Sequence, residues 1–490
     1  KGDGSGLTGI AATNWIANNV TANSSTTAID LALGNVVKFT QSADTTVSFA
    51  NTGTSNIVTF IRIKDSNATE RTLTWPSSIK WDGGSAPTLV PINIGGEEYN
   101  QITLLTRDEG VTWYGWESGS INRKTGLLYV WGANAHGQLG QNNGTFYSSP
   151  VQIPGAWNEI MIGGAADQNH AGATKTDGTL WTWGDGVQGE LGHNLSGPGG
   201  RKSSPTQVPG TTWWASDDKN HDGSAINGGW GVSKIIKSDG TLWQWGYNGY
   251  GILATGNTEN HSSPVQVPGT TWKAISGNSI CCVATKTDGT LWAWGHNEYG
   301  ALGMSNLTDY NSPVQVPGTT WDRPVMGAGQ FSNGAFKTDG TLWVWGKNET
   351  GMLGLNNQTT YSSPKQIPGT TWRSCCMAAG QSGMIATKTD GTLWTWGATG
   401  DGQLGLNDGN QYSSPKQVPG SWSDQVWMQG YSSLAIKTDG TLWSWGRNQY
   451  GRLGINDTTS YSSPKQIGSN TNWIRVGGGG GSWSGAIAEL

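Results

Sequence analysis

A Trp-Gly pair follows a short apolar run at seven places in this chain, and this repetition constrains the fold more than any other feature. The pairs begin at Trp131, Trp183, Trp245, Trp294, Trp345, Trp396 and Trp445. Their spacings are 52, 62, 49, 51, 51 and 49 residues, so the period is close to fifty. Periods of this size are typical of propellers or solenoids rather than of a single irregular core. Residues that recur in every copy are therefore expected to serve the fold, and residues that occur once are the first places to look for function.

Each unit has the pattern of a four-stranded propeller blade. Asp-Gly pairs such as Asp288-Gly289 stand between β-prone stretches, and they tolerate the positive φ angles of a tight two-residue hairpin turn. The following Thr-Leu-Trp-x-Trp segment alternates its side chains between two faces. Prolines such as Pro364 interrupt the chain before the next strand, which fits an edge or a strand start. Because 76 glycines and 18 prolines do not fit a helical repeat, the sequence predicts an all-β, seven-bladed β-propeller.

The two ends of the repeat array complement each other. Residues 485–490 resemble the segment that precedes each Asp-Gly turn, but they lack its hairpin partner. Residues 124–131 supply such a partner strand without the strand before it. We therefore predict that residues 485–490 pair with residues 127–131 and close the ring, which removes the exposed sheet edges of a linear array.

The repeat also carries a family resemblance. The motif WGxNxxGxLG, for example at Trp131, Trp294 and Trp445, is followed by SSPxQxPG. This pattern resembles the RCC1-type repeat over about residues 121–490, and all seven copies match it. The resemblance implies a stiff disc that binds macromolecules through its faces. It does not choose a function, because such proteins include a chromatin-bound guanine-nucleotide exchange factor, a secreted inhibitor of β-lactamases and several scaffolds.

Residues 1–120 form a different region, which lacks the Trp-Gly pairs and has 7 basic and 11 acidic residues. Its strand-like stretches are residues 36–41, 46–50, 56–64, 102–107 and 111–117. Short strands at such spacing predict a small antiparallel β-sandwich, joined to the propeller of residues 121–490 by the linker Glu-Ser-Gly-Ser.

Two stretches of this region carry a second resemblance. GDGSGLTGI at residues 2–10, and WPSSIKWDGGSAPTL at residues 75–89 with TWYGW at residues 112–116, are similar to virion structural proteins of tailed phages of marine bacteria, tail fibres especially. The resemblance implies a virion-attachment or fibre domain in a tail or capsid appendage, assembled as a homotrimer with other virion proteins. A start at Lys1 rather than Met suits a chain that follows a longer fibrous region.

Composition argues against two classes of partner. Charged residues are only 13% of the chain, the net charge is −5, and residues 121–490 carry 22 basic against 23 acidic residues. Nucleic-acid binding normally needs a basic patch that displaces counterions, so no nucleic-acid partner is expected. No apolar run approaches the length of a membrane span, so no membrane insertion is expected.

Catalytic and metal-binding patterns find little support. The cysteines form two adjacent pairs, Cys281-Cys282 and Cys375-Cys376, whereas thiolate ligands of a metal are separated by two or more residues. Buried free thiols are therefore favoured over a disulfide or a metal site. The six histidines have no HExxH-like spacing, and neither a GxSxG elbow nor a phosphate-binding loop is present. We expect no enzymatic activity, cofactor or metal.

The one long interval, of 62 residues, points to a candidate contact surface. Its additional residues fall in LSGPGGRK and in WASDDKNHDGSAINGGWG. Long loops on a rigid scaffold often carry binding function, although a neutral insertion explains the same length equally well. The candidate contact residues are Arg201, Lys202, Trp214, Asp217, Asp218, Lys219, His221, Asp222 and Trp230. Two further tryptophans outside the repeat positions, Trp427 and Trp483, are candidate contacts as well.

Two functions follow from these observations. The first is a non-enzymatic virion fibre or appendage protein whose propeller adheres to a host surface polysaccharide or protein, because indole rings stack on sugars and bury a large apolar area. The second is a cellular or secreted scaffold or inhibitor that binds a protein partner through the propeller face.

Overall fold

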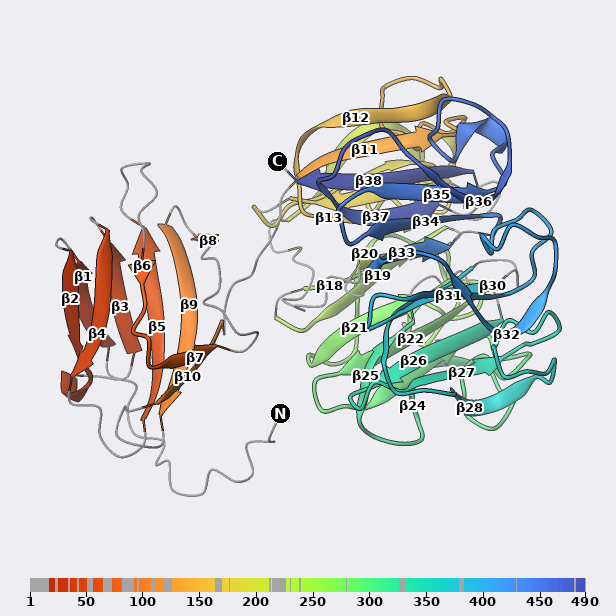
Figure 1. Ribbon diagram of the computed structural model, residues 1–490. Coiled ribbons are helices and arrows are strands. Elements are labelled where there is room, and N and C mark those ends of the chain that lie inside the picture. Colours follow the sequence, from red (N-terminus) through yellow and green to blue (C-terminus); the bar gives the residue numbers. More distant parts are fainter. Residues whose placement is uncertain are drawn as a thin grey trace. The chain divides into compact units, whose positions relative to one another are not determined.

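The computed structural model describes residues 17–22, 25–33, 36–41, 44–50, 56–64, 73–81, 92–94, 97–106, 112–117, 126–163, 170–175, 177–210, 213, 226–229, 231–237, 239–278, 280–325, 331–378, 383–428, 430–479 and 482–489. The chain divides into two compact units, Lys1–Arg123 and Lys124–Leu490 (Figure 1). Strands dominate both units. Short 3₁₀ turns occur at η2 (Leu31–Leu33), η3 (Gly197–Gly200) and η5 (Gln449–Gly451).

The larger unit is a seven-bladed propeller of four-stranded antiparallel sheets, as the repeat predicts (Figure 1). Blade one contains β37 (Trp473–Gly479), β38 (Trp483–Glu489), β11 (Gly126–Gly132) and β12 (Tyr147–Trp157). Blade two contains β13 (Glu159–Gly163), β14 (His170–Thr174), β15 (Leu180–Gly184) and β16 (Lys202–Val208). Blade three contains β17 (Ile226–Gly229), β18 (Val232–Ile236), β19 (Leu242–Gly246) and β20 (His261–Val267).

The remaining four blades repeat this order of strands. Blade four contains β21 (Trp272–Gly277), β22 (Cys281–Lys286), β23 (Leu291–Gly295) and β24 (Tyr310–Val316). Blade five contains β25 (Trp321–Pro324), β26 (Ser332–Lys337), β27 (Leu342–Gly346) and β28 (Tyr361–Ile367). Blade six contains β29 (Trp372–Met377), β30 (Gly383–Lys388), β31 (Leu393–Gly397) and β32 (Tyr412–Val418). Blade seven contains β33 (Trp422–Met428), β34 (Ser432–Lys437), β35 (Leu442–Gly446) and β36 (Tyr461–Gln466).

The antiparallel order of the strands gives the propeller two different faces. Connections from the first to the second strand and from the third to the fourth strand lie on one face, which we call the loop face. The Lys-x-Asp-Gly-Thr turns and the connections to the next blade lie on the opposite face, which we call the hairpin face. First strands contact those of adjacent blades, and β13 touches both β17 and β37, so the series of blades returns to its start.

The ring closes through blade one, where segments from both ends of the array pair. β38 runs antiparallel to β11 from Gly126↔Glu489 to Gly132↔Trp483. The pairing includes Val130↔Gly485 and Leu127↔Ala488, the register expected from the sequence. Figure 1 shows dark-blue β38 lying beside orange β11. No sheet edge is left open at this junction, because β37 and β12 complete the same sheet.

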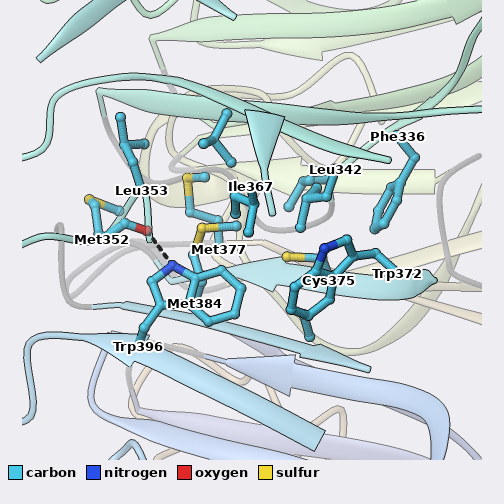
Figure 2. Close-up of a cluster of buried hydrophobic side chains, with 13 residues drawn as sticks. Phe336, Leu342, Met352, Leu353, Ile367, Trp372, Cys375, Met377, Met384 and Trp396 are labelled. Carbon is cyan, nitrogen blue, oxygen red and sulfur yellow. Dashed lines mark hydrogen bonds between the residues drawn. The ribbon is translucent and has the colours of Figure 1, made fainter. Parts of the chain in front are cut away.

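A recurring hydrogen bond explains why every copy keeps its Trp-Gly tryptophan. Trp396 of blade six is fully buried, and its Nε1–H donates to the Met352 carbonyl of blade five at 2.9 Å (Figure 2). The other six copies form the same bond across the preceding blade boundary, at 2.7–2.9 Å, from Trp131, Trp183, Trp245, Trp294, Trp345 and Trp445. The Trp131 bond to the Arg452 carbonyl joins blade one to blade seven. Each indole therefore fills the space between two blades and satisfies a buried carbonyl of its neighbour.

The Asp-Gly turns differ in one respect from the prediction. In blade four the backbone N–H of Lys286 donates to the Thr290 carbonyl, so three residues form the loop. Only Gly289 has a positive φ, of 78°, while Asp288 accepts hydrogen bonds from the Thr290 N–H and hydroxyl at 2.9 and 2.6 Å. The prediction of a two-residue turn with two positive φ angles is therefore wrong. Asp-Gly serves a three-residue turn just as well, because only the glycine must be left-handed.

The smaller unit is built from short strands in two sheets. One sheet has the order β1 (Ala17–Ala22), β3 (Val36–Gln41), β5 (Asn56–Lys64), β9 (Glu97–Thr106), β10 (Trp113–Glu117) and β7 (Ile79–Trp81), with β8 (Ile92–Ile94) beside β9. The other has the order β2 (Thr26–Asp30), β4 (Thr45–Ala50) and β6 (Leu73–Thr74). Buried Val37 and Leu104 of the first sheet share one cluster with Ile29 and Val47 of the second.

The antiparallel arrangement predicted for this region is wrong for most of its strand pairs. β1 pairs with β3, β3 with β5, β2 with β4, and β4 with β6, all in parallel. Antiparallel pairing occurs at β5–β9, β8–β9 and β9–β10. Strands β1 to β6 alternate between the two sheets, and those of them that are neighbours within one sheet run in the same direction. The sequence pattern of a short strand is the same for parallel and antiparallel pairing, because the alternation of its side chains does not depend on the direction of the partner strand.

Candidate binding face

The loop face is built on a recurring asparagine that fixes the connection between the third and fourth strands. In blade three the Asn248 Oδ1 accepts the backbone N–H of Leu253 at 2.8 Å, and its Nδ2 donates to the Asn257 carbonyl at 3.1 Å. Blades one, four, five and seven form the same bonds through Asn134, Asn297, Asn348 and Asn448. The asparagine holds the loop, so the side chains on either side of it are free to differ between blades.

Two loop positions differ strongly from blade to blade. The residue after Trp-Gly is Ala133, Asp185, Tyr247, His296, Lys347, Ala398 or Arg447. The residue three positions further on is His136, Gln188, Tyr250, Tyr299, Thr350, Asp401 or Tyr450. Most of these side chains are half-buried or exposed, and all lie on the same face of the propeller. The loop face therefore presents a different surface on each blade of an otherwise uniform ring.

Aromatic and basic side chains of blades three to five lie along this face in two groups of contacting rings. Tyr250 lies 4.8 Å from the His296 ring and 6.3 Å from the Tyr247 ring. At the next blade boundary, the ring of Tyr299 in blade four lies 4.9 Å from the ring of Phe331 in blade five, and the Lys347 Nζ of blade five lies 4.5 Å from the Tyr299 ring. We call Tyr247, Tyr250, His296, Tyr299, Phe331 and Lys347 the loop-face strip. Its rings are large, rigid contact surfaces of the kind that protein interfaces favour.

A second aromatic group joins blades seven and one on the same face. Phe146 and Tyr450 meet edge to face at 5.4 Å, and both are more than 40% exposed. The Arg447 guanidinium lies 5.2 Å from the Tyr431 ring, which is 43% exposed. Exposed aromatic side chains that already contact one another are held in place before a partner arrives, which lowers the entropy cost of binding.

Charges of both signs surround these rings. His296 lies 3.0 Å from an Asp309 carboxylate oxygen, Lys347 lies 3.1 Å from Glu349, and Arg447 lies 3.9 Å from Asp401. Exposed pairs of this kind contribute little to stability, so they are available to a partner. A surface on which His296, Lys347 and Arg447 each have a carboxylate nearby suits a protein better than the uniformly negative backbone of a nucleic acid.

Two of the predicted contact residues lie at the edge of this face. Arg201 Nε donates to the Asp185 Oδ1 at 3.0 Å, and the other Asp185 oxygen lies 3.3 Å from His136 Nδ1. Lys202 is the first residue of β16. The structure thus brings Arg201 into contact with loop-face residues of blades one and two.

The other predicted contact residues, Trp214, Asp217, Asp218, Lys219, His221, Asp222 and Trp230, lie outside the described residues. The nearby Trp213 is described: it is buried against Trp243 and Trp245 in the position that each repeat gives its tryptophan. The additional tryptophan candidates are not free contacts. Trp483 is fully buried, and half-buried Trp427 packs against hydrophobic clusters on both sides of its blade.

Buried ionisable groups under blades two and three support the loop rather than chemistry. Glu190 is fully buried and accepts the Gln188 N–H at 2.8 Å, and burial raises the pKa of its carboxyl to about 7. His170 is also fully buried, lies 3.0 Å from the Ser233 hydroxyl, and has a pKa that burial lowers to about 4. Both groups favour the neutral form in the folded chain because desolvation disfavours charge.

The four cysteines are free and buried, as expected from their adjacent placement. Cys281 packs between blades four and five, whereas Cys282 packs between blades three and four. Neighbouring residues of a strand point to opposite faces, so the two thiols lie apart. Burial raises the pKa of Cys282 and of Cys376 to about 12, which keeps both as thiols. Within the described residues, no group of three His, Cys, Asp or Glu side chains could hold a metal, and no helix is long and apolar enough to cross a membrane.

The repeat pattern is that of a known family. The regulator of chromosome condensation (RCC1) repeat matches residues 125–164, 239–284, 288–326, 339–386, 390–426 and 439–482. The chain belongs to the RCC1-repeat family. The match omits much of blade two, where the long interval and the Arg201–Asp185 contact are found.

The curated RCC1-repeat relatives match this chain over only part of their own length. E3 ubiquitin-protein ligase HERC2 of Homo sapiens is 27% identical over 294 residues, which is 60% of this chain but 5% of HERC2. Ultraviolet-B receptor UVR8 of Arabidopsis thaliana is 29% identical over 185 residues, 38% of each chain. The chain therefore spans less than two thirds of these curated relatives.

Solved structures share the RCC1 fold at lower identity. Yeast RCC1 (Prp20), crystallised with Kap60, has a TM-score of 0.63 at 20% identity over 74% of this chain and 89% of its own. Human WBSCR16 has a TM-score of 0.63 at 16% identity over 74% of this chain and 99% of its own. These likenesses support the propeller fold alone.

The loop-face strip was missed from the sequence because its residues occur inside a repeated motif. Tyr250 and Tyr299 occupy a variable position of WGxNxxGxLG, and a search for insertions passes over such positions. The signal that could have found them is side-chain variation between copies at a fixed loop position.

Proposed function

We propose that this chain is a non-enzymatic binding protein whose propeller holds a macromolecular partner on the loop face. The observation that carries the proposal is the contrast within one loop: the asparagine is kept in five blades, while the flanking positions carry Tyr250, His296, Tyr299, Lys347 and other differing side chains. In these five blades the hydrogen bonds of the asparagine are what hold the loop, and they do not depend on the flanking side chains. Aromatic and charged diversity on one face of a rigid disc fits a partner that contacts several blades at once.

The non-enzymatic part rests on the state of the reactive groups. The thiols lie in hydrophobic clusters, and the buried carboxyl of Glu190 and imidazole of His170 serve loop and strand contacts. Catalytic groups need access to substrate, which these side chains do not have.

The biological setting that we propose is a virion appendage whose propeller adheres to a host surface polysaccharide or protein. Its support is the resemblance of residues 2–10, 75–89 and 112–116 to tail-fibre proteins. We further propose that residues 1–120 form a β-sandwich attachment domain, that the chain forms a homotrimer with other virion proteins, and that it contacts no nucleic acid and enters no membrane. Arg201 and Lys202, at the end of the connection between β15 and β16, would add to this contact surface.

A cellular or secreted scaffold is the second candidate. Two solved structures with this fold favour it: yeast RCC1 (Prp20) was crystallised bound to Kap60, and Prp20p was examined for binding to Gsp1p and histones. A protein partner on the propeller would also suit the mixed charges of the loop face. Finding the chain in purified virions favours the appendage, and a monomer that binds one cellular protein favours the scaffold.

The test uses the full chain, fluorescently labelled, in adsorption to whole bacterial cells and in cross-linking to their surface proteins. Tyr250→Asp and Tyr450→Asp place charges on the exposed rings of the loop face, and we expect them to abolish retention. Thr370→Asp is the matched control, because Thr370 is exposed on the hairpin face. Equal loss with Thr370→Asp, or full retention with both tyrosine variants, would contradict the proposed face.

A further inference from the structure

One recurring set of side chains lies where the hydrophobic core between two blades meets the surface of the propeller. In blade six the Lys388 Nζ lies 4.7 Å from the Trp372 ring and 4.5 Å from the Trp394 ring. Trp372 is buried, whereas Trp394 and Lys388 are half-buried. The Trp394 Nε1 is held by the Thr392 hydroxyl at 2.8 Å, so the ring has a fixed orientation. The ammonium is thus held against two indole rings at the surface.

These three side chains line a pocket between blades five and six. The pocket has a volume of about 350 Å³ and also includes Pro368 and the exposed Asn356 of blade five. We call it the rim groove of blade six. It combines apolar indole surface with a cation and polar side chains, the mixture that small-molecule sites use for affinity and orientation.

A glutamine lies beside the rim groove without a structural role. Gln417 is the cross-strand partner of Trp394, so the two side chains lie next to each other on one face of the sheet. It is exposed, and its side chain forms no hydrogen bond to any described residue. A glutamine stands at this place in all seven blades: Gln152, Gln207, Gln266, Gln315, Gln366, Gln417 and Gln466. All seven glutamines are exposed, so core packing does not explain why glutamine recurs at this position.

The ammonium of the rim groove has no carboxylate partner. Lys388 makes no ion pair with a described residue. The nearest candidate, Asp390, uses its Oδ1 to accept the Thr392 N–H and hydroxyl at 3.0 and 2.7 Å. A cation that is fixed over aromatic rings and left without a counter-charge is ready for an anionic ligand.

The arrangement recurs in six blades. The lysine Nζ lies 3.7–5.3 Å from both indole rings in every copy: Lys175 with Trp157 and Trp181, Lys237 with Trp213 and Trp243, Lys286 with Trp272 and Trp292, Lys337 with Trp321 and Trp343, Lys388 with Trp372 and Trp394, and Lys437 with Trp422 and Trp443. Blade one differs, because Tyr129 replaces the second tryptophan and Ala488 stands at the lysine position.

We infer that the rim groove of blade six, and with it the lysine–tryptophan clusters of the other five blades, bind an acidic polysaccharide, each cluster taking one uronate sugar. The apolar face of a pyranose ring packs on the half-buried indole, the glutamine amide bonds its hydroxyls, and the lysine ammonium binds its carboxylate. A polymer of identical sugars can occupy several of the six similar lysine–tryptophan clusters at once, so its overall affinity exceeds that of a single weak contact. This site lies apart from the loop face and does not require the partner proposed there.

The experiment titrates the full chain with a trimer of mannuronate, using calorimetry for stoichiometry and tryptophan fluorescence for the groove. A neutral glucose trimer of equal length is the ligand control. We expect about six mannuronate trimers per chain, binding that weakens with added salt, and neutral-sugar binding that is weaker by about tenfold or more. Lys388→Met removes one cation and should remove one site.

Gln417→Glu is the second variant, because Gln417 is exposed and its replacement does not disturb packing. A carboxylate beside the groove repels a uronate, so this variant should also lose one site. Gln358→Glu is the matched control on an exposed loop of blade five, and it should keep all sites. No mannuronate binding, a single site per chain, or an unchanged count in both groove variants would overturn the inference, whereas cell adsorption through the loop face would be unaffected.

Discussion

Replacing Glu190 by glutamine tests how a buried carboxyl sets the pH dependence of this propeller. One Glu190 oxygen accepts the Gln188 N–H at 2.8 Å, and the other is buried with no hydrogen bond to a described residue. Blades one and six use a neutral amide at the same place: Gln138 accepts the His136 N–H at 2.9 Å, and Gln403 accepts the Asp401 N–H at 3.1 Å. Glu190→Gln therefore copies a solution that the repeat already contains.

The size of the effect follows from the pKa of Glu190. Burial, together with the nearby Asp185 carboxylate, raises this pKa from 4.5 to about 7. The folded chain thus prefers the protonated carboxyl, so the stability contributed by this preference is complete below pH 4.5 and is lost as the pH rises to about 7. At about 1.4 kcal/mol per pKa unit, wild type loses about 3 kcal/mol of unfolding free energy over this window. The glutamine variant does not titrate and loses none of it.

The measurement is urea unfolding of wild type and variant from pH 4 to pH 9, followed by tryptophan fluorescence. The difference between the two curves isolates Glu190, because His170 acts on both chains: its pKa, lowered by burial from 6.5 to about 4, costs stability as the pH falls through that range. We expect a difference that grows by about 3 kcal/mol between pH 4.5 and pH 7 and then stays constant. Gln403→Glu is the reciprocal control: it places a carboxyl at the same position of blade six, and its unfolding free energy should fall as the pH rises. Parallel curves for wild type and Glu190→Gln at every pH would refute the reasoning.

Four further changes test the architecture by thermal or chemical unfolding. Ala254 has a left-handed φ of 57° at a position where the other six blades have glycine, so Ala254→Gly should stabilise the chain by about 1 kcal/mol. Gly354→Ala should destabilise it by more than this, because the φ of Gly354 is 70° and a Cβ there would lie 2.6 Å from the Trp396 Nε1. Trp396→Phe removes the bond to the Met352 carbonyl and should cost about 1–3 kcal/mol. Deleting residues 485–490 removes most of β38 and should sharply lower the melting temperature; an unchanged melting curve would contradict closure through blade one.

The propeller could be predicted because its repeated residues are tied to backbone geometry. Each Trp-Gly tryptophan bonds a carbonyl of the preceding blade, so its spacing reports the spacing of the blades. The turn type could not be predicted, because Asp-Gly satisfies both a two-residue and a three-residue loop. The strand direction in the smaller unit was hidden for a related reason: Val47 alternates with exposed Thr46 and Ser48, and it would do so whether the neighbouring strands are parallel or antiparallel.

The candidate site was harder to predict because the sequence was searched for residues that occur once. Trp483 appeared unique by its spacing, yet it occupies the strand position held by His170 in blade two and Cys281 in blade four, and packing buries it there. Tyr250 and Tyr299 lie in the repeat itself and were overlooked. Whether such a side chain reaches solvent depends on the neighbouring blade, which a single repeat does not contain.

The two surfaces of the propeller imply different kinds of recognition. A partner on the loop face meets a different pair of side chains on each blade, so rotating it by one blade replaces Tyr250 by Tyr299 and Tyr247 by His296. Such a surface holds one partner in one orientation. A ligand in the rim grooves meets the same lysine and tryptophans six times, so rotation by one blade leaves most of its contacts unchanged. Stoichiometry therefore separates the two modes, because the first saturates at one partner per chain and the second requires several equal ligand units.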